Sequence, residues 1–140
     1  MKGLLATMPL DATLRDFLNE QRFAVLATIN ADGSPQQTVM WYELRGDTIM
    51  MNTTLSRVKG KNLQRDPRIS ICVEDDYHYV TISGVAQLND DQPTAQADIR
   101  ALAIRYHGQE EGDRQAREMF AKQQRVSIYL PITHVVVKDS

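Results

Sequence analysis

Short β-rich segments that alternate with tight-turn residues most constrain the fold of this chain. Asp32-Gly33, Arg45-Gly46-Asp47 and Asp75-Asp76 each follow one such segment, and Asp-Gly supplies the positive φ that a hairpin turn requires. The expected strands are 23–29, 37–44, 48–53, 69–73, 79–88, and 125–130 continued by 132–137. Six strands joined mostly by hairpins predict a mainly β protein with an antiparallel barrel, not a parallel α/β sheet.

Helical patterns occupy the remaining segments. Asp11 or Thr13 is expected to cap a first helix, and a short helix should run from Val58 to about Arg65. Two further helices are expected over residues 93–106 and about 113–123. Gly84 predicts a bulge or sharp bend and Pro131 an edge or bend, both of which help a sheet to curl.

Composition favours one domain over residues 1–140. The chain has 42% hydrophobic residues and no linker-like composition break. Residues 1–9 have too short an apolar run for a signal peptide, and no segment approaches the roughly 20 apolar residues of a membrane helix. We therefore expect a cytoplasmic protein without a membrane partner. The single cysteine, Cys72, predicts a buried, unreactive thiol.

Residues 52–68 concentrate positive charge. Five of the chain's 16 basic residues fall there with Asp66 as the only acid, although the whole chain has a net charge of -2. Hydroxyl groups, a guanidinium and helix amide donors meet at one strand-to-helix junction, which favours phosphate binding. The alternative is an ordinary solvated helix with salt-bridging cations.

Other chemistries have weaker signals. His78, His107 and His134 lack metal-ligand spacing to one another or to Cys72, so no metal site is expected. No nucleophile elbow, Walker loop or dinucleotide-binding glycine motif occurs. Nucleic acid is not an expected partner, because the chain is acidic overall and its aromatic residues are not interleaved with the cations. An enzyme of this kind would rely on a bound cofactor.

Several motifs together resemble a known family. The Asp32-Gly33-Ser34-Pro35 turn, Val39-Met40-Trp41-Tyr42 and the run 52–68 resemble the split-barrel flavin-binding family of the pyridoxamine-phosphate oxidase type. The pattern Arg57-Val58-Lys59, its continuation through Asn62 to Arg68 and the closing segment 125–135 resemble the deazaflavin-dependent branch of that family.

This resemblance implies a homodimer of six-stranded split barrels with flanking helices and two cofactor sites at the subunit interface. It assigns the phosphate to Thr53, Thr54, Ser56, Arg57 and Lys59, with Asn62 in the same motif. It assigns the ring to Gln37, Thr38, Val39, Met40 and Trp41, and lets Tyr79 and Arg125 approach from the partner subunit. Trp41 has an alternative role as a plain core or interface aromatic. Arg57 and Lys59 are both expected outside the core.

The chain also departs from the oxidases of that family. They commonly carry Ser-Arg-Lys in succession, whereas this chain has Ser56-Arg57-Val58-Lys59, and their carboxy-terminal Trp and Arg pattern is absent. The resemblance therefore implies an oxidoreductase that uses coenzyme F-420, a deazaflavin, to reduce a small conjugated substrate. It identifies no catalytic residue, although Tyr79 is a candidate acid. The alternatives are an FMN-dependent oxidoreductase of the same fold, or a non-catalytic carrier of flavin, deazaflavin or haem.

Overall fold

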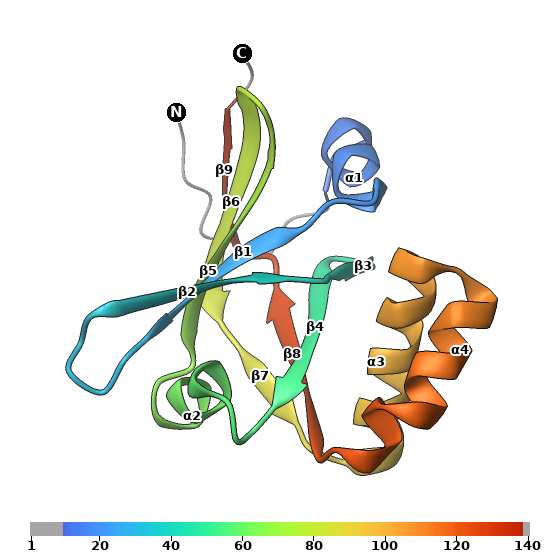
Figure 1. The fold of residues 1–140 in the computed structure, drawn as a ribbon. Coiled ribbons are helices and arrows are strands. Elements are labelled where there is room, and N and C mark those ends of the chain that lie inside the picture. Colours follow the sequence, from blue (N-terminus) through green and yellow to red (C-terminus); the bar gives the residue numbers. More distant parts are fainter. Residues whose placement is uncertain (1–9, 139–140) are drawn as a thin grey trace.

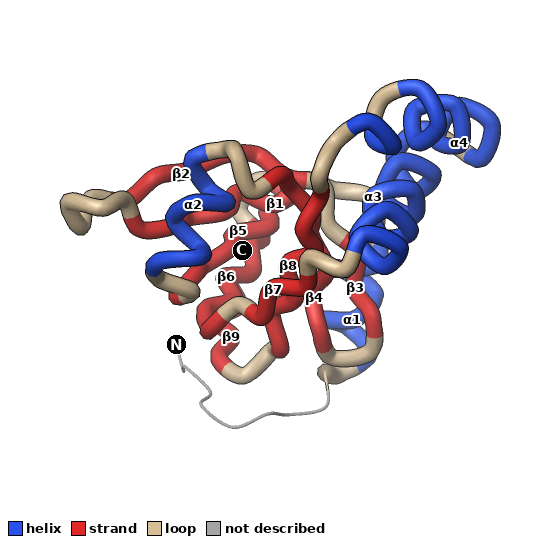
Figure 2. Tube along the Cα trace, turned by 90° about the horizontal axis from the view of Figure 1, so that it is seen from below, coloured by secondary structure: helices blue, strands red, loops and turns tan. Residues whose placement is uncertain are grey.

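Two antiparallel sheets form the body of the protein. The computed structural model describes residues 10–138, so the apolar run at residues 1–9 lies outside the described part. One sheet has the strand order β2-β1-β5-β6-β9 and the other β3-β4-β8-β7. In Figure 1, β2 and β1 cross the four-stranded sheet at a steep angle. Figures 1 and 2 both show helices α3 and α4 together on one side of the strands.

The elements follow one another in this order. The strands are β1 (Ala24–Ile29), β2 (Pro35–Met40), β3 (Glu43–Arg45), β4 (Thr48–Thr54), β5 (Arg68–Asp75), β6 (His78–Val85), β7 (Gln87–Asn89), β8 (Arg125–Pro131) and β9 (His134–Lys138). The helices are α1 (Ala12–Asn19), α2 (Val58–Arg65), α3 (Gln92–His107), α4 (Gln109–Glu118) and the short 3-10 helix η1 (Phe120–Lys122). In the described part of the chain, no helix is both long and apolar enough to cross a membrane.

Three of the six expected strands are each divided in two, which gives nine strands over residues 10–138. Each divided strand leaves one sheet and enters the other, as β2 does on becoming β3. At each break one backbone N–H bonds outside the regular strand pairing. Tyr42 N donates to the Tyr106 hydroxyl at 3.1 Å. Ala86 N donates to Pro67 O at 2.7 Å, and Ile132 N donates to Asp47 O at 2.9 Å. The breaks are therefore hydrogen-bonded corners that let two sheets share one core.

The expected bend at Gly84 is wrong by two residues. Gly84 pairs regularly with Ile69, and the corner falls at Ala86. A Cβ at Gly84 would lie 3.0 Å from Leu130 Cδ1, so the glycine allows a neighbouring strand to approach closely. Pro131 does end β8 at a corner, as expected.

The core lies between the two sheets and includes side chains of α1. Among its fully buried side chains are Leu18, Leu26, Tyr42, Ile71 and Leu130. Asp11 caps α1 by accepting a hydrogen bond from Leu14 N at 2.8 Å, which confirms one of the two expected caps. The Tyr42 hydroxyl donates to Leu18 O at 2.8 Å and ties this helix to the corner after β2.

The helix α2 has the expected bounds and sits tightly against the end of β4. A Cβ at Gly60 would lie 2.4 Å from Thr54 O, closer than real side chains approach. Gly60 therefore permits the close contact that places the first turn of α2 beside the four-stranded sheet. Arg57 at the N-cap and Lys59 in this first turn frame the site described next.

The last helical region differs from its expected bounds. The helix expected over about 113–123 begins at Gln109 and ends at Glu118, before η1. Gly108, whose φ is 89°, marks the start of α4, whereas residues 118–124 contain no glycine or proline that would mark its end.

Candidate anion-binding site

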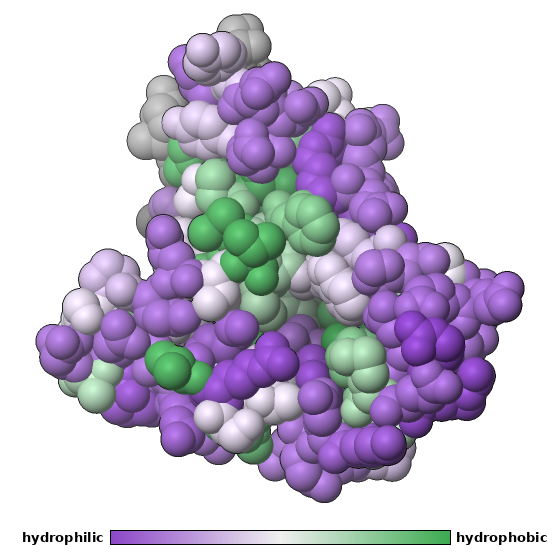
Figure 3. Space-filling model, viewed as in Figure 1, coloured by the Kyte–Doolittle hydropathy of each residue, from purple (hydrophilic) through white to green (hydrophobic). Residues whose placement is uncertain are grey.

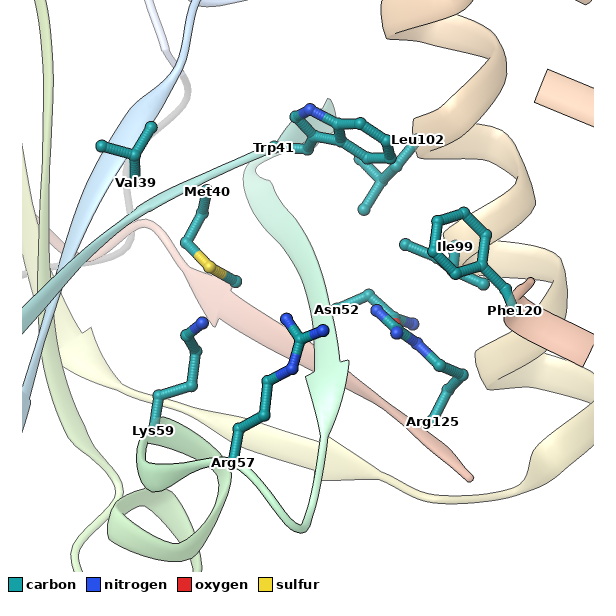
Figure 4. Close-up of a pocket in the computed structure, with 10 residues that line it drawn as sticks. All are labelled: Val39, Met40, Trp41, Asn52, Arg57, Lys59, Ile99, Leu102, Phe120 and Arg125. Carbon is teal, nitrogen blue, oxygen red and sulfur yellow. The ribbon is translucent and has the colours of Figure 1, made fainter. Parts of the chain in front are cut away.

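A pocket of about 210 Å³ opens between β2, β4, the first turn of α2, α3 and the start of β8. Its polar side is formed by Asn52, Arg57, Lys59 and Arg125. Its apolar side is formed by Val39, Met40, Trp41, Ile99, Leu102 and Phe120. Figure 4 shows the ends of the Arg57, Lys59 and Arg125 side chains directed into the same space. None of these ten described residues is acidic.

The three cations differ in burial. Arg57, the N-cap residue of α2, is exposed, whereas Lys59 is 8% and Arg125 only 4% exposed. The prediction that Lys59 lies outside the core is wrong, because its side chain is buried. The tight docking of α2 on β4 turns its first-turn side chain inward.

The electrostatics of the pocket favour a negative ligand. Burial lowers the pKa of Lys59, and the neighbouring Arg57 and Arg125 lower it further. Burial, with a smaller effect of Arg57, lowers the pKa of Arg125 to about 10. In the described residues, none of the three side chains forms an ion pair. An anion between them would relieve this unfavourable concentration of charge.

The Arg125 guanidinium is fixed in direction. Its Nε donates to Asn52 Oδ1 at 2.9 Å and its Nη1 to Gln123 Oε1 at 2.6 Å. The guanidinium also lies over the Phe120 ring, 5.0 Å from its centroid. Arg125 therefore lines the pocket of its own chain, whereas the family resemblance allowed it to approach from the partner subunit.

An aromatic wall closes the other side. The Trp41 ring stacks on Tyr106 with centroids 5.3 Å apart and planes 10° apart, and it meets the edge of Phe120. Trp41 thus packs against α3 and also lines the pocket, and its contact with a cofactor ring stays a prediction. A flat apolar group fits a wall of this kind.

A second hollow of about 310 Å³ adjoins the first at Arg57, which lines both. It is lined by Thr54, Leu55, Ser56, Arg57, Gln123 and Gln124. The hydroxyls of Thr54 and Ser56 lie 3.1 Å apart. The structure therefore brings these two predicted phosphate ligands to the far side of Arg57.

Five predicted site residues line neither hollow. Gln37 is exposed on β2, while the hydroxyls of Thr38 and Thr53 are buried with no hydrogen-bond partner among the described residues. Asn62 instead holds α2 to β1 by donating to Thr28 Oγ1 and Asn30 Oδ1, each at 3.0 Å. Tyr79 pairs with Glu74 and Lys138 in the five-stranded sheet. Strand alternation explains Thr53, because its neighbour Asn52 takes the pocket side.

Four pocket residues were not predicted. The sequence contained a signal for Asn52, because a polar residue within an apolar strand segment indicates a buried polar group. The side chain is 5% exposed. Ile99 and Leu102 share a helix face at i, i+3 spacing, but this pattern does not tell which neighbour the face meets. Phe120 lies in η1, where the sequence indicates no contact.

The two antiparallel sheets and their flanking helices define a mainly β split barrel. The family model described as pyridoxamine 5'-phosphate oxidase matches residues 10–135, and the chain belongs to this family. The prediction of the fold class is therefore confirmed, with a larger number of strands because three of them change sheets.

Solved structures of similar proteins extend this comparison. A conserved hypothetical protein from Mycobacterium tuberculosis, Rv2991, has a TM-score of 0.81 and 28% identity over 99% of this chain and 90% of that one. An F-420 reductase has a TM-score of 0.70 and 25% identity over 87% of this chain and 94% of that one. HutZ, the haem storage protein from Vibrio cholerae, has a TM-score of 0.68 and 20% identity over 94% and 96%, which shows the fold alone.

Proposed function

We propose that this protein is an oxidoreductase that binds coenzyme F-420 and reduces a small conjugated molecule. The observation that carries the proposal is the set of Arg57, Lys59 and Arg125 around one pocket with no acidic lining residue. A phosphodiester with an anionic tail suits such a set, and the aromatic wall suits a tricyclic ring. The family and the similarity to an F-420 reductase support this choice.

The chain's own residues would bind and orient the coenzyme. Arg57 offers a planar fork for phosphate at the N-terminus of α2. Lys59 adds a buried positive charge, and Trp41 with Phe120 restricts the position of a flat group and excludes water. The bound deazaflavin would supply the hydride. None of the ten described lining residues carries a carboxyl, imidazole or phenol group, so in this proposal the proton comes from solvent.

We also propose a homodimer formed through the outer face of the five-stranded sheet. A row of side chains crosses all five strands of this sheet, because Val39 pairs with Val25, Val25 with Cys72, Cys72 with Thr81 and Thr81 with Val136. None of the five is fully buried, and Val39 is 65% exposed. Cys72 is only half-buried in this row, so the prediction of a buried thiol is wrong.

The position of this row favours a second copy of the chain as its cover. Val39 belongs both to the row and to the pocket lining, so a partner seated there would lie beside the pocket. Figure 3 shows an apolar area near the middle of the molecule, over the part that β1 and β2 occupy in Figure 1. Large exposed apolar patches commonly mark interfaces.

The experiment that tests the function is identification of the cofactor. The protein is purified gently from a host that makes both flavins and deazaflavin, and the bound molecule is identified by absorption and mass spectrometry. We expect F-420. Recovery of FMN would favour the FMN-dependent alternative, and haem recovered with no hydride transfer would favour a carrier.

A further inference from the structure

Arg125 is a nearly buried guanidinium surrounded by amides. Among the described residues, its side chain donates two hydrogen bonds, both to carboxamide oxygens, those of Asn52 and Gln123. Its backbone is held by a third amide, since Arg125 N donates to Gln92 Oε1 at 3.0 Å and Gln92 Nε2 donates to Arg125 O at 2.9 Å. Buried charges in proteins are normally paired with an opposite charge, which makes this set of neutral partners unusual.

A buried carboxylate stands close by but is committed elsewhere. Asp98, 4% exposed, accepts hydrogen bonds from Arg45 (2.7 Å), Ser127 (2.6 Å) and Tyr129 (2.5 Å). Burial alone would raise its pKa, but these hydrogen bonds outweigh burial and lower it. Asp98 therefore stays ionised and balanced by Arg45, so its charge is not available to Arg125.

Asn52 links this acidic cluster to the pocket without carrying charge. Its Nδ2 donates to Ala95 O at 2.9 Å and to Ser127 Oγ at 3.4 Å, which leaves Oδ1 facing Arg125. The hydrogen bonds that Nδ2 donates thus fix the orientation of the amide. An aspartate here would have no donor for Ala95 O and would place a negative charge against Arg125.

We propose that Asn52 and Gln123 determine the anion specificity of the pocket, because their amide oxygens aim the Arg125 guanidinium without neutralising it. This inference rests on the proposed function and names two residues that set ligand charge. A carboxylate at either position would occupy the same hydrogen bond and offset the positive charge that a phosphate group requires. Because amide oxygens are neutral, they fix the direction of the guanidinium and leave its positive charge uncompensated.

Gln123 gives the sharper test, because it is only half-buried and its substitution is less disruptive than that of Asn52. Gln123→Ala removes the aiming hydrogen bond, whereas Gln123→Glu keeps an acceptor and adds a negative charge. Binding of inorganic pyrophosphate and of FMN to the full chain is measured by calorimetry at several salt concentrations. Asn52→Asp provides the same charge change from the buried side.

We expect Gln123→Ala to weaken pyrophosphate binding less than about 5-fold with an unchanged salt dependence, since a neutral hydrogen bond contributes modestly. Gln123→Glu should weaken it more than about 10-fold and flatten the salt dependence, because one screened attraction is cancelled. Gln64→Glu, an equal charge change at an exposed position of α2, should resemble the wild type. Thermal melts check that each variant is folded.

Equal binding by Gln123→Ala and Gln123→Glu, with the same salt dependence, would overturn the inference and leave these amides a structural role. If Asn52→Asp does not fold, the Gln123 pair alone decides the result. A wild-type protein that binds neither pyrophosphate nor FMN nor F-420 would overturn the proposed function together with this inference. If the wild type binds these ligands and the Gln123→Glu and Gln123→Ala variants bind them equally well, only the inference is overturned.

Discussion

Two buried cations of the pocket lower the stability of the ligand-free protein and favour the binding of an anion. Lys59 and Arg125 are buried without a negative partner among the described residues, and burial disfavours their charged forms. Such an arrangement lowers the stability of the ligand-free protein and strengthens the attraction for an anion. The two effects can be separated by substitution, because removal of the charge should change them in opposite directions.

Arg57→Ala should weaken binding of F-420 roughly 10- to 100-fold, because a hydrogen bond to a charged group contributes about 1.5–3 kcal/mol. Arg57 is exposed, so the ligand-free variant should melt at the wild-type temperature. Fluorescence titration and thermal melts check both points, with Arg100→Ala on the exposed side of α3 as the control. Unchanged affinity in a folded Arg57→Ala variant would remove Arg57 from the site.

Lys59→Met should raise the melting temperature of the ligand-free protein at neutral pH while weakening F-420 binding. The folded state lowers the pKa of Lys59, so at neutral pH the charged lysine opposes folding. As the pH rises through the folded pKa toward the unfolded value of about 10.4, this penalty disappears. The stability difference between the variant and the wild type should therefore shrink over that alkaline range, which denaturant unfolding at several pH values measures. A difference that is constant with pH would contradict this explanation.

At the scale of elements, the docking of α2 on β4 builds the cationic side of the pocket. The sequence predicted α2 well, because Pro67 and the helical pattern bound it closely. The depth of docking was not predictable, because it depends on the contact between Gly60 and Thr54 O, and so Lys59 was expected near solvent. Likewise the strand segments and the bend at Pro131 were predicted, but the corners at Tyr42 and Ala86 were not. Their hydrogen-bond partners, Tyr106 in α3 and Pro67 before β5, could not be identified from the sequence.

Gly60→Ala tests this docking. In an exposed helix the substitution would stabilise by up to about 1 kcal/mol. Here we expect a loss of about 1–3 kcal/mol, because the new methyl group would force α2 away from Thr54 O. Denaturant unfolding measures the change, with Lys61→Ala on the exposed side of the same helix as the control. A stabilised Gly60→Ala variant would show that α2 has room to move.

At the scale of the whole molecule, the two sheets give the pocket and the proposed dimer face a common border at Val39. The family resemblance implied a homodimer before any geometry was known, and the half-exposed row across the five-stranded sheet now offers a specific surface for it. The location expected from the sequence, the cytoplasm, stays a prediction.

Val25→Lys should convert the proposed dimer to a monomer near 15.9 kDa, because it places a charge in the middle of the apolar row. The side chain is only half-buried, so the monomer should remain folded by circular dichroism. Multi-angle light scattering measures the mass, and Gln64→Lys on α2 should leave the mass unchanged. A wild-type protein that is a monomer with cofactor bound would contradict the dimer proposal.

The proposed function requires this pocket to bind a deazaflavin through its phosphate and anionic tail. The most direct measurement is a calorimetric titration of the wild-type protein with F-420, FMN and riboflavin, which carry progressively less negative charge. We expect the tightest binding for F-420, weaker binding for FMN and the weakest for riboflavin, with the advantage of F-420 decreasing as salt is added. FMN binding as tight as F-420 binding, or an F-420 affinity that does not depend on salt, would contradict it.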